Sequence, residues 1–156
     1  MILINIPEIK KFMYSLLKTS FFDEFELRKV SIQTFAKFDI DGTLCHDFFD
    51  EEEQQDIENL FFSSWEEIRP IVYELIKGKK LPKTLKIVLS VPEKKLPEIH
   101  ENASSLFINI LFENGELNVI TGASQRVFSL DKSMENKFDD YVLTFLEPFN
   151  AKIKDE

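Results

Sequence analysis

The sequence predicts an α+β domain, in which an antiparallel or mixed sheet of about five to six strands carries about three helices. Two dipeptides that favour tight hairpin turns, Asp41-Gly42 and Asn114-Gly115, each lie between strand-like runs. Segments whose apolar residues recur at helical spacing separate and follow these runs. Because hairpins pair antiparallel strands and the helices must cover the sheet, we expect the α+β class and not a parallel α/β fold.

The N-terminal elements are a short strand and an amphipathic helix. Residues 2–6 are apolar and strand-like, and Pro7 suits the first turn of a helix, where its missing N–H has no partner to lose. Apolar residues then recur at helical spacing as far as Leu17, which predicts a helix over residues 7–18.

The next segment alternates between apolar and polar residues. Val30, Ile32 and Ile40 share one parity, which predicts a half-solvated strand. Asp41-Gly42 is then expected to turn the chain into a second strand at residues 43–49. Residues 50–58 are acidic and are expected to form a solvated helix or loop.

A second long helix is expected to begin at Ser64, which can form a capping box with Glu67, and to stop at Gly78. Pro70 is expected to kink or split it. Residues 84–91 are predicted to form a strand, and an irregular or short helical link follows.

The second hairpin is the clearest element of the chain. Its Asn114-Gly115 turn places Ile110 opposite Val119 and Phe112 opposite Leu117. Residues 125–130 are expected to form another strand, and Asp131 to cap a last helix. No repeat or convincing linker interrupts the chain, so residues 1–156 are predicted to be a single domain.

Composition and charge narrow the classes of function. The net charge of −9 argues against nucleic acid or an anionic membrane as a partner. The single cysteine excludes an intrachain disulfide, and the start of the chain does not resemble a signal peptide, so we expect a cytoplasmic protein. One cysteine and two separated histidines cannot form a zinc site alone, and no cofactor is expected.

The segment Asp39-Ile40-Asp41-Gly42-Thr43-Leu44 resembles the first motif of the haloacid dehalogenase-like phosphatases. The resemblance implies Asp39 as nucleophile, Asp41 as general acid/base and a magnesium ion beside them. In that family the motif ends a buried parallel strand, whereas the alternation before Asp39 is typical of a half-solvated strand. We therefore expect a hairpin turn here, and a magnesium-dependent phosphatase is the alternative.

A basic cluster follows the second long helix. Lys77, Lys79, Lys80 and Lys83 lie within seven residues, with Arg69 upstream. Lysines at the C-terminus of a helix complement its dipole without any ligand. Solvated lysines are thus the expectation, and an anion- or nucleotide-binding site formed by these five residues is the alternative.

The chain holds 16 Phe against 3 Tyr and 1 Trp. Most of these rings should be core, but both rings of a doublet on a strand cannot face the same core. Phe21-Phe22, Phe48-Phe49 and Phe61-Phe62 are such doublets, and we expect one ring of each to be exposed or buried against a partner. The sequence therefore favours a non-catalytic domain that acts through a protein partner or as a homodimer.

Four segments carry a resemblance over nearly the full length: SIQTFAKFDIDG, WEEIRPIVYELIKGKKLP, LFINILFENGEL and ITGASQRVFSLDKS, together with the final helix. The chain resembles a family of short Firmicute proteins catalogued as a domain of unknown function. The resemblance implies a bacterial, cytoplasmic protein, with no established activity and no catalytic residue.

Overall fold

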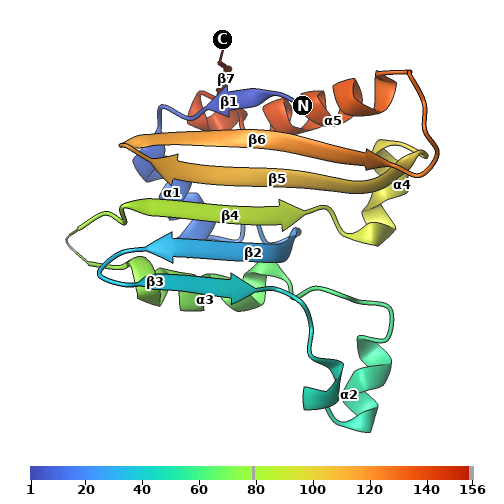
Figure 1. Cartoon of the computed structure of the whole chain (residues 1–156), viewed down its shortest axis with the longest axis horizontal. Helices are drawn as coiled ribbons and strands as arrows, with labels where there is room; N and C mark the ends of the chain where they lie inside the picture. The colour runs from blue at the N-terminus through green and yellow to red at the C-terminus, as the bar shows by residue number, and fades with distance from the viewer. Residues whose placement is uncertain (79, 155–156) are drawn as a thin grey trace.

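The computed structural model describes residues 1–78 and 80–154, which form a single antiparallel sheet in the strand order β3-β2-β4-β5-β6-β1-β7 (Figure 1). The seven strands are β1 (Leu3–Asn5), β2 (Glu26–Gln33), β3 (Lys37–Asp41), β4 (Thr84–Ser90), β5 (Ala103–Glu113), β6 (Glu116–Gln125) and β7 (Lys152–Ile153). The five α-helices of this described part are α1 (Ile9–Lys18), α2 (Glu51–Asp56), α3 (Trp65–Ile76), α4 (Leu96–Ile99) and α5 (Ser133–Phe145). The α+β class is confirmed, and the expected numbers of strands and helices were slightly too low.

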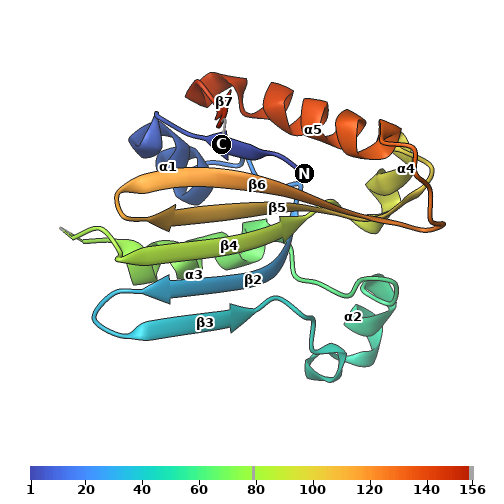
Figure 2. The ribbon, with the colours of Figure 1, turned by 45° about the horizontal axis from the view of Figure 1, so that its top comes forward.

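Helices cover one face of the sheet. Figures 1 and 2 show α1, α3 and α5 on the same side, with the strands open on the other. Side chains along the strands alternate between the two faces accordingly. Val30 and Ile32 of β2 are buried under the helices, whereas Lys29, the residue before Val30, is exposed on the open face. The core is therefore one-sided.

The core under the helices is aromatic and closely packed. Phe12 of α1 contacts Phe22 and Phe149 edge to face, with ring centroids 5.2 Å apart in both pairs. Trp65, the first residue of α3, is fully buried, and its indole N–H donates to the carbonyl of Leu16 at 2.9 Å. This bond joins α3 to α1 and gives the indole N–H a partner, which it would otherwise lack in the buried position.

The hairpin of β5 and β6 has the expected register. Ile110 pairs with Val119, and Phe112 pairs with Leu117. Asn114 and Gly115 have φ values of 51° and 75°, which is the left-handed backbone that a two-residue turn of this type requires. The turn predicted from Asn-Gly is confirmed.

The turn predicted at Asp41-Gly42 is wrong, because the hairpin turns earlier. Strands β2 and β3 pair Val30 with Ile40 and Ile32 with Phe38, around a turn centred on Phe35. The two residues of each pair lie equally many positions before and after residue 35, so both have even numbers or both have odd numbers. The apolar–polar alternation of the sequence therefore continues through the turn without a break. This turn contains no Gly, Asn, Asp or Pro, and so the sequence gives no sign of it.

Gly42 is required by a close approach of backbones. A Cβ atom on Gly42 would lie 1.9 Å from the carbonyl oxygen of Leu27. Its N–H donates to the carbonyl of Arg28 at 3.0 Å, and its carbonyl accepts from the N–H of Ser63 at 2.7 Å. Residues 43–49, expected as a strand, instead leave the sheet and begin the excursion that contains α2.

Three predictions about the helices have different outcomes. Ser64 caps α3 as expected, accepting from the N–H of Glu67 at 3.4 Å. The helix continues through Pro70 and is not split there. The predicted cap at Asp131 is wrong in position, because the N-cap of α5 is Lys132; Asp131 precedes it and accepts from the N–H of Ser133 at 2.9 Å.

Candidate functional site

Residues 45–60 form a projection that we call the acidic arm. It extends away from the sheet beyond the end of β3, with α2 at its tip (Figure 1). The arm contains seven Asp and Glu residues and neither Lys nor Arg. No residue of α2 is buried, and α2 begins with a capping box between Asp50 and Glu53. The arm is thus held by its base and by local capping.

Aromatic side chains line the arm and its base. Phe48 is 83% exposed and Phe61 is 60% exposed, whereas Phe49 and Phe62 are half-buried. The expectation of one exposed ring is confirmed for these two doublets. It is wrong for Phe21-Phe22, because those residues precede β2 in a turn and both rings pack into the core.

Residues 127–130 form a second projection, which we call the apolar loop. Val127, Phe128 and Leu130 are 72%, 82% and 84% exposed. The sequence predicted a strand here, which is wrong because β6 ends at Gln125. The sequence pattern missed the loop because a short apolar run has the composition of a strand, whether or not a neighbouring strand pairs with it.

Hydrogen bonds hold the backbone of the apolar loop. The side chain of Asn102 donates to the carbonyl of Val127 at 2.9 Å and accepts from its N–H at 3.0 Å. The side chain of Gln125 does the same for Ser129, at 3.2 and 2.8 Å. The apolar side chains are thus presented from a fixed backbone, which lowers the entropy cost of binding.

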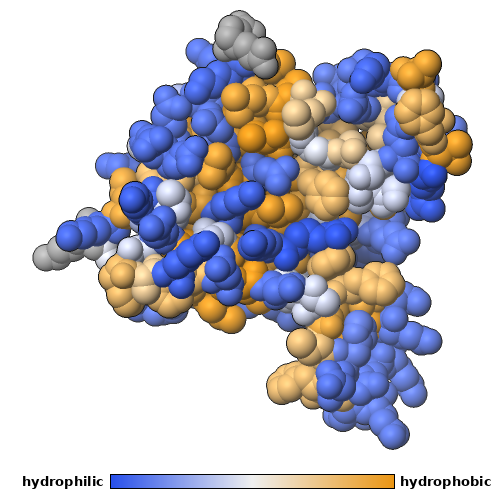
Figure 3. All heavy atoms as spheres, in the orientation of Figure 1, coloured by the Kyte–Doolittle hydropathy of each residue, from blue (hydrophilic) through white to orange (hydrophobic). Residues whose placement is uncertain are grey.

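The acidic arm and the apolar loop lie at the same end of the sheet. Strand β3 ends where β2 begins and β6 ends where β5 begins, and β2, β4 and β5 are consecutive neighbours. Figure 3 shows the two projections with a recess between them. We call this region the open end of the sheet.

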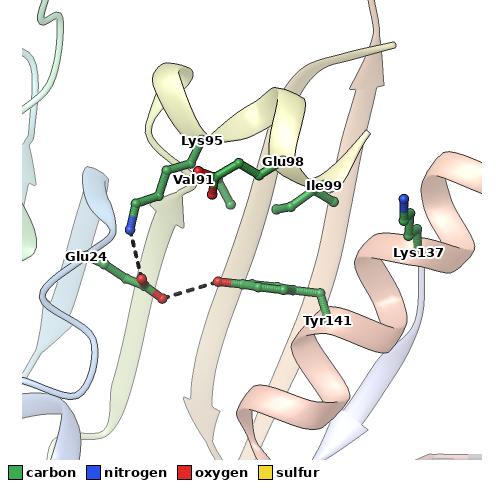
Figure 4. Close-up of a pocket in the computed structure, with 7 residues that line it drawn as sticks. All are labelled: Glu24, Val91, Lys95, Glu98, Ile99, Lys137 and Tyr141. Atoms are coloured by element: carbon green, nitrogen blue, oxygen red, sulfur yellow. Dashed lines mark hydrogen bonds and ion pairs between the residues drawn. The ribbon is translucent and has the colours of Figure 1, made fainter. Parts of the chain in front are cut away.

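A cavity of about 320 Å³ lies near the open end, between α4 and α5 (Figure 4). Glu24 accepts from Lys95 at 3.0 Å and from the hydroxyl of Tyr141 at 3.2 Å. Burial, and next the charge of Glu24, raises the pKa of Tyr141 to about 12. Tyr141 is therefore a hydrogen-bond donor at neutral pH and not a base, and its contact with Glu24 ties α5 to the segment before β2.

Asp39 and Asp41 lie on the exposed face of β3. They project to the same side, as the phosphatase alternative needs. However, β3 is an edge strand of an antiparallel sheet and not a buried parallel strand. The side chain of Asp41 accepts from the N–H of Thr43 at 2.8 Å, and hydrogen bonds with Thr43 lower its pKa. The second aspartate thus has a structural role in starting the excursion.

The predicted basic site is divided by the structure. Arg69 donates two hydrogen bonds to Asp23, at 3.0 and 2.8 Å, and so joins α3 to the turn before β2. Lys77 pairs with Glu74, and Lys80 and Lys83 are exposed in the connection to β4. Lys79 lies outside the described residues. Arg69 is therefore occupied by a carboxylate of the same chain. The N–H of Lys83 donates to the carbonyl of Gln33 at the end of β2, so the α3–β4 connection lies at the end of the sheet opposite the open end (Figure 1).

Within 1–78 and 80–154, no group of three or more His, Cys, Asp or Glu side chains is arranged to hold a metal ion. In the same part of the chain, no helix has the length and apolar character needed to cross a membrane.

Comparison with known proteins identifies the family. A model described as a family of unknown function, DUF5721, matches residues 15–154. The chain belongs to this family. The DUF5721 match includes the whole sheet except β1, and also both projections of the open end. No curated protein and no solved structure matches the chain significantly.

Proposed function

We propose that the protein is a non-catalytic domain that acts through protein–protein contact at the open end of the sheet. The observation that carries the proposal is the apolar loop, in which three large apolar side chains are exposed on a backbone fixed by Asn102 and Gln125. Contiguous exposed apolar side chains are typical of interaction surfaces.

The partner at the apolar loop is a second copy of the chain. Charges of both signs flank the loop, with Arg126 and Lys132 close to Asp131. Next to Phe128 lies an open hollow of about 430 Å³, which residues 100–102, Asp131 and the loop itself line. A symmetric dimer can therefore insert Phe128 of each copy beside the loop of the other, as an isologous interface requires.

The acidic arm cannot be the centre of such a symmetric contact. Two arms facing each other would bring together fourteen carboxylates, twice the seven of one arm, without a Lys or Arg. Because a specific dimer buries about 1,200–2,000 Å² in total, surface around the apolar loop must contribute beside its three side chains. We expect the arms to lie at the outside of the dimer.

The test is the molar mass in solution, measured by gel filtration with light scattering. We expect wild-type protein to elute as a dimer and the Phe128→Ser variant to elute as a monomer. Phe35→Ser is the matched control, because Phe35 is equally exposed but lies in the β2–β3 turn at the other end. A wild-type monomer over the whole concentration range, or equal effects of both variants, would refute the dimer.

The phosphatase alternative is supported only by the shared orientation of Asp39 and Asp41. It predicts magnesium-dependent hydrolysis of p-nitrophenyl phosphate that Asp39→Asn abolishes. Our proposal predicts no hydrolysis by either protein.

A further inference from the structure

The side chain of Arg28 lies on the open face of the sheet, where two aromatic rings and one hydroxyl contact it. A bulge interrupts β2 between Leu27 and Lys29 and contains Arg28. The guanidinium carbon lies 3.7 Å from the ring centroid of Phe62 and 5.1 Å from that of Phe107. These distances place a cation against two aromatic rings.

One hydrogen bond fixes the orientation of this guanidinium. Its Nε donates to the hydroxyl of Ser90, which is buried, at 3.0 Å. Within the part of the chain that the structure describes, this is the one hydrogen bond of the Arg28 side chain, and no carboxylate there forms an ion pair with it. Its two terminal nitrogens are thus free to bind an anion through two parallel bonds.

Arg28 lines a cavity of about 170 Å³ that also contains two carboxylates, Glu26 and Glu93. The remaining lining residues are Phe61, Phe62, Val91, Leu96, Ser104 and Ser105. Arg28 and Glu26 are close enough to influence each other electrostatically, yet they form no ion pair within the described chain. The lining of the cavity therefore contains one positive group, Arg28, and two negative groups that are not paired with it.

The environment of these charges is only partly solvated. Burial raises the pKa of Glu26, against the charge of Arg28, and the charge of Glu93 raises it further. Burial lowers the pKa of Arg28. Both charged forms have lost solvation without gaining an ion-pair partner among the described residues, and a ligand with complementary charges would stabilise both.

The lining selects among ligands. A guanidinium with two free nitrogens fits a carboxylate or a phosphate. Two carboxylates in the same cavity repel a doubly charged phosphate and attract an ammonium group. Val91, Leu96 and Phe61 add apolar wall that suits an aliphatic side chain.

We propose that this cavity binds a free α-amino acid with an apolar side chain, with its carboxylate on Arg28 and its ammonium group facing Glu26 and Glu93. None of the lining residues of this site belongs to the apolar loop, so Phe128→Ser leaves the lining intact and the two proposals can be tested separately.

The first test measures thermal stability and calorimetric binding of the whole protein with L-leucine as the probe. We expect L-leucine to raise Tm by about 5–11 °C at a hundred times its Kd. L-leucinamide lacks the carboxylate, N-acetyl-L-leucine lacks the ammonium group, and inorganic phosphate tests the anion alone. Each of these three should bind at least about tenfold more weakly.

The second test uses variants. Arg28→Lys keeps the charge but loses the planar fork, and Glu26→Gln loses the negative charge; each should weaken L-leucine binding about tenfold or more. Arg126→Lys is the matched control, since Arg126 donates to the carbonyl of Ala103 outside the cavity and should leave binding unchanged. If Arg28→Lys does not fold, Glu26→Gln and the leucine derivatives still decide the question. Absence of binding by L-leucine, or equal binding of N-acetyl-L-leucine or phosphate, would overturn the proposal.

Discussion

Replacement of Gly42 by Ala tests the close approach between the backbones of Gly42 and Leu27, which explains why a glycine follows Asp41. The added Cβ would lie 1.9 Å from the carbonyl oxygen of Leu27 and 2.6 Å from its carbon. A carbon and a carbonyl oxygen normally lie no closer than about 3.3 Å, so the two backbones must separate by about 1.4 Å. Because both groups are backbone, no side-chain rotation can relieve the contact.

Separation weakens the bonds that Gly42 makes with Arg28 and Ser63, at 3.0 and 2.7 Å. Each is worth about 1 kcal/mol, and overpacking adds about 1–3 kcal/mol. We therefore expect Gly42→Ala to lower the free energy of unfolding by about 3 kcal/mol and Tm by about 6–12 °C.

The assay is urea unfolding followed by the fluorescence of Trp65, the single tryptophan, which is fully buried. Gly122→Ala is the matched control, because its Cβ would meet Phe107 at an ordinary 3.7 Å, and it should change stability by less than about 0.5 kcal/mol. If Gly42→Ala is as stable as the control, the close approach of β2 and the segment after β3 does not exist.

Three further predictions concern the ionisable groups. Since the folded state keeps the Tyr141 proton to about pH 12, wild-type stability should fall as pH rises from 10.0 to about 12, and Tyr141→Phe should lessen that fall in urea unfolding at each pH. Arg69→Met should lower the free energy of unfolding by about 1–3 kcal/mol, because it leaves the carboxylate of Asp23 without its bidentate partner; an unchanged urea midpoint would show that the pair contributes nothing. Any Tm shift that phosphate gives in a thermal-shift assay should be the same for wild type and Lys83→Ala, since Arg69 is occupied; stabilisation lost in Lys83→Ala would restore the anion-binding alternative at the lysines.

Local patterns predicted the elements whose residues determine their own conformation. Asn114-Gly115 adopts the left-handed backbone that its turn needs, so the hairpin and its register followed from sequence. The β2–β3 turn did not follow, because Phe35 at its centre has no turn preference and the alternation continues across it. Gly42 was misassigned for a related reason, since a close approach to Leu27 is a tertiary property that no local pattern carries.

The candidate surfaces were predicted in part. The doublets Phe48-Phe49 and Phe61-Phe62 indicated exposed rings, and one ring of each is exposed, but neither doublet lies in a strand of the sheet. The strand argument therefore does not explain the exposure, which follows from the excursion of the chain into the acidic arm. Arg28 gave no such signal, because its contacts depend on Phe107, Ser90 and Phe62 from three separate segments. Only the folded sheet brings these residues to the same face.

The most direct test of the proposed contact is photo-crosslinking of purified protein with a photoreactive phenylalanine analogue at position 128. If two copies meet at the apolar loop, the analogue at position 128 gives a crosslinked dimer. The analogue at position 35, which is also exposed but lies at the other end of the sheet, gives none. No crosslinked dimer from position 128, or equal yields from both positions, would contradict the assignment of the apolar loop as the contact between two copies.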